Sequence, residues 1–236
     1  DLAVDVQGRI YVLCSAVEGH PLQIFDYNGD YLNYFDFHGG PSWDSLSISS
    51  MVIDDQEQMF LADEKGGRIL SYNLSGDYRM EFPLFPEMKE KLRREQVLGA
   101  IYEDGHLIYV PAPMLGSVYC YDKQGALVKT VGRFGGGYGE LAFPISVSTD
   151  IQGNVLVLDK HRHTVISFDS AGNVNGEIGG MGSEFGSFYH PIFLSSDDRN
   201  RIWVAQGFHN LVQVLQLPLG TETVPAQLEK TVVVGP

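Results

Sequence analysis

The sequence has few cysteines, few basic residues and no long apolar run. It holds 2 cysteines, Cys14 and Cys120, without a C-x-x-C spacing, which excludes a disulfide framework and a cysteine-based metal or haem motif. No apolar run approaches the roughly 20 residues of a membrane helix, so we expect no membrane insertion. Lys and Arg number 16 against 30 Asp and Glu, a net charge of −14. Such a field repels nucleic acid, so we expect no nucleic-acid partner.

Glycine, in contrast, is abundant and gathers in two long stretches. Residues 132–144 read GRFGGGYGELAFP, and residues 179–191 read GGMGSEFGSFYHP. The first alone is compatible with a phosphate-binding loop, but the second repeats its glycines and its final proline with one constant offset of 47 residues. A glycine-rich segment that returns at a fixed period is a connector between repeats. We therefore predict sharp connectors with glycines at positive φ, and no nucleotide site.

The rest of the chain repeats with a similar period. An aromatic residue stands four residues before a glycine at Phe25, Tyr72, Tyr121 and Phe168. Before each of these lie two short apolar runs separated by a turn, as in SVSTDIQGNVLVL, and the composition of these runs is typical of β-hairpins. A third strand and a more polar fourth strand follow.

Four antiparallel strands in a unit of about 47 residues are typical of a blade of a β-propeller. We predict an all-β fold in a single β-propeller domain over residues 1–236. One helix is expected, at 86–96 (PEMKEKLRREQ), as a solvated insertion in the second blade. The predicted blades are 1–48, 49–96, 97–144, 145–191 and 192–236.

The repeat resembles that of the NHL-repeat β-propellers, in which a glycine-rich connector, an aromatic residue and a proline precede two apolar strands that each end in Asp. The fourth blade follows the pattern best, at Gly135, Tyr138, Gly139, Pro144, Asp150, Gly153, Asp159, Phe168 and Gly172. Because propellers of this family commonly have six blades, the resemblance implies a six-bladed ring with one blade missing from this chain, with a five-bladed ring as the alternative. Residues 230–234 (KTVVV) would supply the outer strand of the fifth blade.

Carboxylates recur near the end of the first strand of each blade. A ring of acidic oxygens at one face would suit Ca²⁺, whereas an Asp at a hairpin turn also accepts hydrogen bonds from turn amides. We favour the turn-capping interpretation and keep the metal as the alternative. The residues are Asp5, Asp54, Glu103, Asp150 and Asp197.

Histidines supply the other candidate metal ligands. His161 and His163 share one predicted loop, and His190 precedes Pro191, which is expected to begin a blade. Some enzymes with this fold hold zinc through histidines or use them as acid–base groups, so Zn²⁺ is the second open alternative. Otherwise we expect no cofactor.

Aromatic residues gather on the predicted connectors, where an exposed cluster would form a contact surface for a partner. We predict that Tyr138 and Phe185 occupy equivalent, partly buried positions between blades. The candidate interaction surface comprises Trp43, Phe134, Tyr138, Phe143, Phe185, Phe188, Tyr189 and His190.

These features favour a non-enzymatic scaffold that binds a protein partner, since no G-x-S-x-G motif occurs. By analogy with bacterial relatives of the family, we expect an extracytoplasmic (periplasmic or secreted) location and a place in a larger complex, for example with electron-transfer proteins. The alternative is a propeller enzyme, a lyase or hydrolase that uses a divalent metal in the central channel.

Overall fold

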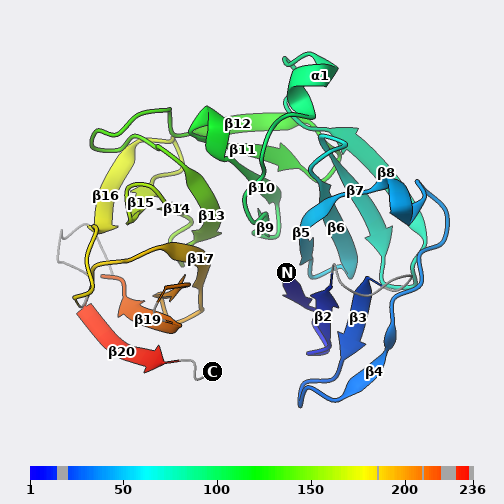
Figure 1. Cartoon of the computed structure of the whole chain (residues 1–236), viewed down its shortest axis with the longest axis horizontal. Helices are drawn as coiled ribbons and strands as arrows, with labels where there is room; N and C mark the ends of the chain where they lie inside the picture. The colour runs from blue at the N-terminus through cyan, green and yellow to red at the C-terminus, as the bar shows by residue number, and fades with distance from the viewer. Residues whose placement is uncertain (15–20, 185, 209, 219–226, 234–236) are drawn as a thin grey trace. The chain divides into compact units, whose positions relative to one another are not determined.

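The fold is an all-β propeller, as the sequence predicts (Figure 1). A computed structural model describes residues 1–14, 21–184, 186–208, 210–218 and, by their backbone alone, 227–233. In these residues the strands form five antiparallel sheets of four strands each, and every sheet keeps its strands in chain order. No helix of the described residues is long enough to cross a membrane.

The chain divides into two compact units. The first comprises Asp1–Ile108 and Tyr121–Leu127, and the second comprises Tyr109–Cys120 and Val128–Pro236. The first unit contains the first two blades, and the second contains the last two. The prediction of a single domain stays a prediction.

The first blade consists of β1 (Leu2–Val4), β2 (Ile10–Leu13), β3 (Leu22–Phe25) and β4 (Tyr31–Tyr34). Each strand pairs with the next one in antiparallel register. A short 3-10 helix, η1 (Trp43–Ser45), lies in the connector to the second blade.

The second blade has longer strands. They are β5 (Ile48–Ile53), β6 (Gln58–Asp63), β7 (Arg68–Asn73) and β8 (Tyr78–Pro83). Pairing is again sequential, with a register shift between Ser71 and Tyr72 in the β7–β8 ladder.

The predicted helix at 86–96 is much shorter than expected. Only α1 (Glu90–Arg93) is helical, and none of its residues is buried. Lys89 stands at the N-cap and makes no side-chain capping bond. A solvated segment without a cap or an apolar face lacks the interactions that stabilise further turns.

The third blade comprises β9 (Tyr102–Glu103), β10 (Leu107–Ala112), β11 (Ser117–Asp122) and β12 (Leu127–Val131). Its first strand has only two residues. A 3-10 turn, η2 (Pro113–Leu115), ends at Gly116 in the left-handed conformation.

The fourth and fifth blades complete the second unit. The fourth comprises β13 (Pro144–Thr149), β14 (Val155–Asp159), β15 (Thr164–Phe168) and β16 (Val174–Gly179). The fifth comprises β17 (Pro191–Ser196), β18 (Arg201–Gln206), β19 (Leu211–Gln216) and β20 (Gln227–Val233). The pairing of β20 with β19 confirms that residues 230–233 supply the outer strand. A sixth blade outside this chain stays a prediction.

The middle strands of each blade contribute most of the core. β14 is buried along its whole length, and β6 is buried from Met59 to Asp63. Continuous apolar runs of this kind fit strands that are covered on both faces. In the first unit the core includes Tyr11, Leu61 and Tyr72.

The glycine-rich connectors have the geometry that their repetition predicts. Gly132 and Gly139 have φ of +78° and +72°, and the equivalent Gly179 and Gly186 have φ of +102° and +77°. Each connector leads into a strand that begins at a proline. Only glycine adopts these backbone angles freely, so the prediction of blade connectors is confirmed.

Polar side chains on the first strands join neighbouring blades within each unit. In the first unit the Ser50 hydroxyl accepts a hydrogen bond from the Ile101 amide at 3.0 Å. In the second, the Ser146 hydroxyl accepts one from the Leu194 amide at 3.1 Å. Both serines are 1% exposed. Each serine therefore satisfies a main-chain amide that would otherwise have no partner at the interface.

The first blade makes the same contact with a carboxylate. Asp1 Oδ2 accepts hydrogen bonds from the Met51 amide at 2.9 Å and from the Ser50 hydroxyl at 2.7 Å. In all three cases the acceptor stands four residues before a turn aspartate, namely Asp5, Asp54 or Asp150. This inter-blade bond is therefore a feature of the repeat.

Replacing Ser146 with Ala should lower the free energy of unfolding by about 1–3 kcal/mol, because the buried Leu194 amide loses its acceptor. Denaturant titration of the Ser146→Ala variant measures the effect. Ser195→Ala, at an exposed position on β17, is the control and should be nearly neutral. Equal stability of the two variants would contradict the inter-blade role of Ser146.

Candidate functional site

The predicted carboxylates lie at hairpin turns, and four of the five cap their own turn in the same way. Asp150 Oδ1 accepts hydrogen bonds from the amides of Gln152 and Asn154, both at 2.9 Å. The residue three positions after the carboxylate has positive φ, as at Gly153. This is the arrangement that an Asp-initiated turn favours. The same pair of amide bonds is made by Asp5, Asp54 and Asp197.

In the third blade the turn is capped by the neighbour of the predicted residue. Asp104 Oδ1 accepts the amides of His106 and Leu107 at 3.0 Å and 2.8 Å. Glu103 instead accepts the Gly105 amide at 2.6 Å. The turn is shorter than in the other blades, which moves the capping position by one residue.

The second oxygen of each turn aspartate is also bonded. Arg9 Nε donates to Asp5 Oδ2 at 2.6 Å, and Arg201 Nε donates to Asp197 Oδ2 at 2.7 Å. Asn154 Nδ2 donates to Asp150 Oδ2 at 2.7 Å. These carboxylates therefore have local partners on both oxygens.

A buried ion triad replaces the arginine in the second blade. Lys123 Nζ lies 2.8 Å from Asp54 Oδ2 and 3.0 Å from Glu103 Oε1. Burial alone would lower the pKa of Lys123, but its hydrogen bonds to the two carboxylates outweigh burial and raise that pKa. Lys123 is therefore a permanent cation that binds both acids in the first unit.

No three His, Cys, Asp or Glu side chains in the described part of the chain lie close enough together to hold a metal ion. Binding of Ca²⁺ by the carboxylates, or of Zn²⁺ by the histidines, stays a prediction. The contacts of the carboxylates support the turn-capping interpretation.

The predicted connector aromatics differ widely in exposure. In the first unit Trp43 is half-buried and stacks on Phe37 with ring centroids 4.7 Å apart. In the second unit Phe134 is 69% exposed and Phe188 is fully buried. Phe143 is half-buried. Phe185 lies outside the described residues.

Tyr138 is not buried between blades as predicted, since it is 70% exposed. The buried residue of its connector is Leu141, whose amide donates to the Arg133 carbonyl at 2.9 Å. Leu141 packs against Gly132, where an added Cβ would lie 2.3 Å from its side chain. Phe188 packs in the same way on Gly179, at 2.5 Å. In each connector, therefore, the apolar side chain that packs into the interior lies three residues after the position predicted from the sequence.

A cluster of histidine and aromatic rings forms in the second unit. We call His163, Tyr189, His190 and Phe208 the histidine–aromatic cluster. Ring centroids are 4.6 Å apart for Tyr189 and His190, 5.2 Å for Tyr189 and Phe208, and 5.9 Å for His163 and His190. The residues come from the β14–β15 loop, the connector before β17 and the β18–β19 loop. His161 from the first of these loops stacks on Phe143 at 4.4 Å.

The cluster is held by unusual backbone geometry. His163 and His190 have φ of +57° and +49°, in the left-handed region that non-glycine residues rarely adopt. Their carbonyls accept the amides of Gly180 at 2.8 Å and Gly207 at 3.1 Å, respectively. Left-handed residues cost roughly 1–3 kcal/mol and persist only where the surrounding structure imposes them. Such strain is often found at functional sites.

Next to the cluster, the residue that ends the second strand of the fifth blade differs from its equivalents in the second and fourth blades. Asp159, at the end of β14, accepts the Phe143 amide at 2.8 Å, and Asp63 accepts the Ser47 amide in the same way at 3.0 Å. Gln206 takes this place in the fifth blade and accepts the Tyr189 amide at 2.6 Å. Gln206 is 3% exposed, and its Nε2 has no hydrogen-bond partner among the described residues.

The surroundings of His163 favour its neutral form. Burial and the neighbouring His190 lower its pKa from the usual value. Its Nδ1 is buried and has no partner among the described residues. The cluster therefore combines a partly buried histidine with an exposed histidine and two aromatic rings, one of them the highly exposed Phe208.

Sequence reasoning identified His163, Tyr189 and His190 but not Phe208 or Gln206. Phe208 follows Gly207 in a loop of the fifth blade, where the repeat has drifted most. The signal that could have revealed this region is Gln206, because the register places it where the second and fourth blades have Asp.

Chemically, the cluster is an apolar surface with polar edges. Tyrosine, histidine and phenylalanine rings provide contact area with few rotatable bonds, and the tyrosine hydroxyl and imidazole nitrogens provide hydrogen bonds. Ile192, which is 51% exposed, has a side-chain atom 3.4 Å from the position of a Cβ on Gly207 and extends this apolar surface. Such composition is typical of the energetic centre of a protein interface.

No protein-family model matches the chain, and no curated protein sequence matches it. Solved structures, however, share its fold. Virginiamycin B lyase from Staphylococcus aureus superposes with a TM-score of 0.62 at 10% identity, over 91% of this chain and 65% of the lyase. This chain thus spans less than two thirds of the length of that enzyme.

Two further structures are similar. A chain of the nidogen/laminin complex aligns with a TM-score of 0.66 at 15% identity, over 92% of this chain and 74% of that one. A protein of unknown function from Bacteroides thetaiotaomicron aligns with a TM-score of 0.66 at 17% identity, over 90% and 57% of the two chains. Because these sequence identities are low, the comparisons show only the fold, which places the chain in the class of β-propellers.

Asp197 should make stability depend on acid pH. Burial raises its pKa, but hydrogen bonds from Arg201, Trp203 and the turn amides outweigh burial and lower that pKa to about 2. Because the folded pKa lies below the unfolded value, the stabilisation is present above about pH 4 and is lost as pH falls towards 2. Denaturation curves of wild type and Asp197→Asn between pH 5 and 2 should converge at the acid end. A constant difference would contradict this assignment.

The connector geometry predicts a large loss of stability on substituting Leu141 and almost none on substituting Tyr138. Leu141→Ala should lower the free energy of unfolding by roughly 2–5 kcal/mol, the usual range for a buried leucine. Tyr138→Ala should change it by less than about 0.5 kcal/mol, because its side chain is largely in solvent. Urea unfolding of both variants measures this, and a large effect of Tyr138→Ala would contradict the described connector.

Proposed function

We propose that the chain is an NHL-type propeller that acts as a protein-binding scaffold and contacts its partner through the histidine–aromatic cluster. The observation that carries the proposal is the cluster itself: rings from the last two blades converge where two histidines occupy strained backbone conformations. Strain of this kind costs stability. The presence of these costly backbone conformations is consistent with selection for a surface that binds a partner.

The exposure of the cluster supports a macromolecular partner. Phe208 is 66% exposed and Ile192 is 51% exposed, so the surface is open rather than a closed substrate cavity. Large apolar side chains gathered at an exposed site, with polar groups at the rim, mark interaction surfaces in soluble proteins.

The similar chain in the nidogen/laminin complex offers an analogy, because that structure is a complex of two proteins. The lyase shows that the same architecture also serves an enzyme, so the fold alone does not decide between the two. An extracytoplasmic location, and a partner among electron-transfer proteins, stay predictions from the family resemblance.

A paired substitution tests the proposal. Tyr189→Ser with Phe208→Ser removes two rings of the cluster and should abolish retention of the partner when the tagged chain is purified from its native source. The hydrophobic contact area is lost, while the fold should remain because neither ring is fully buried.

Phe134→Ser with Tyr138→Ser is the control, since it removes two exposed rings from another connector of the same unit. Both variants should have circular dichroism spectra like the wild type. Isolation of the wild type without any crosslinked partner, or equal retention by both variants, would contradict the proposed contact surface.

A further inference from the structure

A cavity lies in the first unit, beside the second blade and α1, apart from the histidine–aromatic cluster. Its volume is about 430 Å³, within the size range of small-molecule sites. Residues of the β6–β7 loop, of β7 and β8, and of α1 and its end line it. They include Gly66, Arg68, Glu81, Glu90, Arg93 and Arg94.

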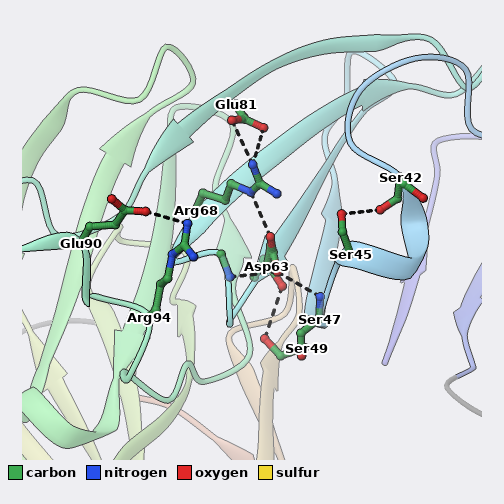
Figure 2. A network of polar contacts seen from close by, with 11 residues as sticks. Ser42, Ser45, Ser47, Ser49, Asp63, Arg68, Glu81, Glu90 and Arg94 are labelled. Carbon is green, nitrogen blue, oxygen red and sulfur yellow. Dashed lines mark hydrogen bonds and ion pairs between the residues drawn. The ribbon is translucent and has the colours of Figure 1, made fainter. Parts of the chain in front are cut away.

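The cavity gathers arginines in an acidic protein. The whole chain has 16 Lys and Arg against 30 Asp and Glu, yet three arginines line this one cavity. Two of the three are paired with glutamates, as Figure 2 shows. Arg68 Nη1 lies 3.0 Å from Glu81 Oε2, and Arg94 Nη2 lies 2.6 Å from Glu90 Oε1.

Arg68 is fixed at the wall of the cavity. Its Nε donates to Oδ2 of Asp63 at 2.9 Å, and Asp63 is fully buried. The other oxygen of Asp63 accepts the amides of Ser47 and Gly66 at 3.0 Å and 3.1 Å. In Figure 2, Arg68 lies between Asp63 and Glu81. The position of this guanidinium is therefore set by a buried carboxylate.

Arg93 differs from the other two arginines. Its Nη2 donates to the Met88 carbonyl at 3.2 Å. Among the described residues it makes no ion pair, and its Nε is buried without a hydrogen-bond partner. A buried N–H of a cation without an acceptor is costly, and Arg93 differs from Arg68 and Arg94 in having no carboxylate partner among the described residues.

The neighbouring loop holds Arg93 in place. Gly67 has φ of +61°, and a Cβ there would lie 2.5 Å from Arg93 Cγ. The aliphatic part of Arg93 thus packs directly on the loop backbone, in space that only glycine leaves free. The guanidinium is presented in a defined position and does not need to be ordered on binding.

We propose that this cavity binds a small carboxylate-bearing molecule, whose carboxylate accepts hydrogen bonds from Arg93 and Arg94. Arg68 and Arg94 each have a glutamate partner, and Arg93 is the arginine of the lining without a carboxylate partner among the described residues. The planar guanidinium matches the geometry of a carboxylate.

The test uses the full chain with succinate, benzoate and inorganic phosphate as probes. The side-chain Nε–H resonances of arginine are followed by NMR during each titration. A carboxylate probe should shift the Arg93 signal in a saturable way, and phosphate should bind more weakly. Absence of any saturable shift at Arg93 would overturn the proposal, and tighter binding of phosphate would overturn the assignment to a carboxylate.

Substitutions locate the site. Arg93→Gln should weaken binding roughly tenfold or more, because one charge-assisted contact is lost. Arg133→Gln is the control, since it removes the same charge from an arginine that does not line the cavity. Arg133 is 79% exposed and lies in the second unit. For Arg93→Gln, binding is followed at the Arg94 resonance. If Arg93→Gln does not fold, Arg94→Gln serves instead, and unchanged affinity in the folded variant would contradict the site.

Discussion

The propeller depends on one repeated hydrogen bond between blades. On the first strand, four residues before the turn aspartate, a side-chain oxygen accepts the main-chain amide of the next blade. Ser50 and Ser146 make this bond with a hydroxyl, and Asp1 makes it with a carboxylate. Inner strands of neighbouring blades are not paired in a common ladder, so their facing amides need side-chain acceptors.

The candidate site arises where this regularity is relaxed. Asp159 joins a connector to the loop after the second strand with both oxygens, and Asp63 joins the equivalent segments with one oxygen. Gln206 keeps the bond to the connector but cannot accept the loop amides with its Nε2. Departure from the repeat and exposure of aromatic rings coincide in the fifth blade.

The sequence predicted the architecture well because turns and glycines carry strong local signals. The blade boundaries follow from Asp-capped hairpins, and even Glu57 and Asn200, which replace the turn glycine, keep φ of +60°. The helix was overestimated, because a charged segment without a cap extends for only four residues. The constant offset shows which residues of the two connectors are equivalent, but not which residue of a connector turns inward. The predicted burial of Tyr138 was therefore wrong. The cluster was only partly predicted, since its rings come from three loops.

The inter-blade hydrogen bond has a consequence for folding. Because every donor is a main-chain amide and two of the acceptors are serines, this bond cannot distinguish one blade from another. Correct order of assembly must come from contacts that are not repeated, such as the edge-on packing of Phe37, from the connector after the first blade, against Tyr72 of the second blade. Proteins that stack similar units are prone to join the wrong neighbours while they fold. Divergence between the blades is thus a safeguard against misassembly, and a chain with five identical blades would fold less faithfully.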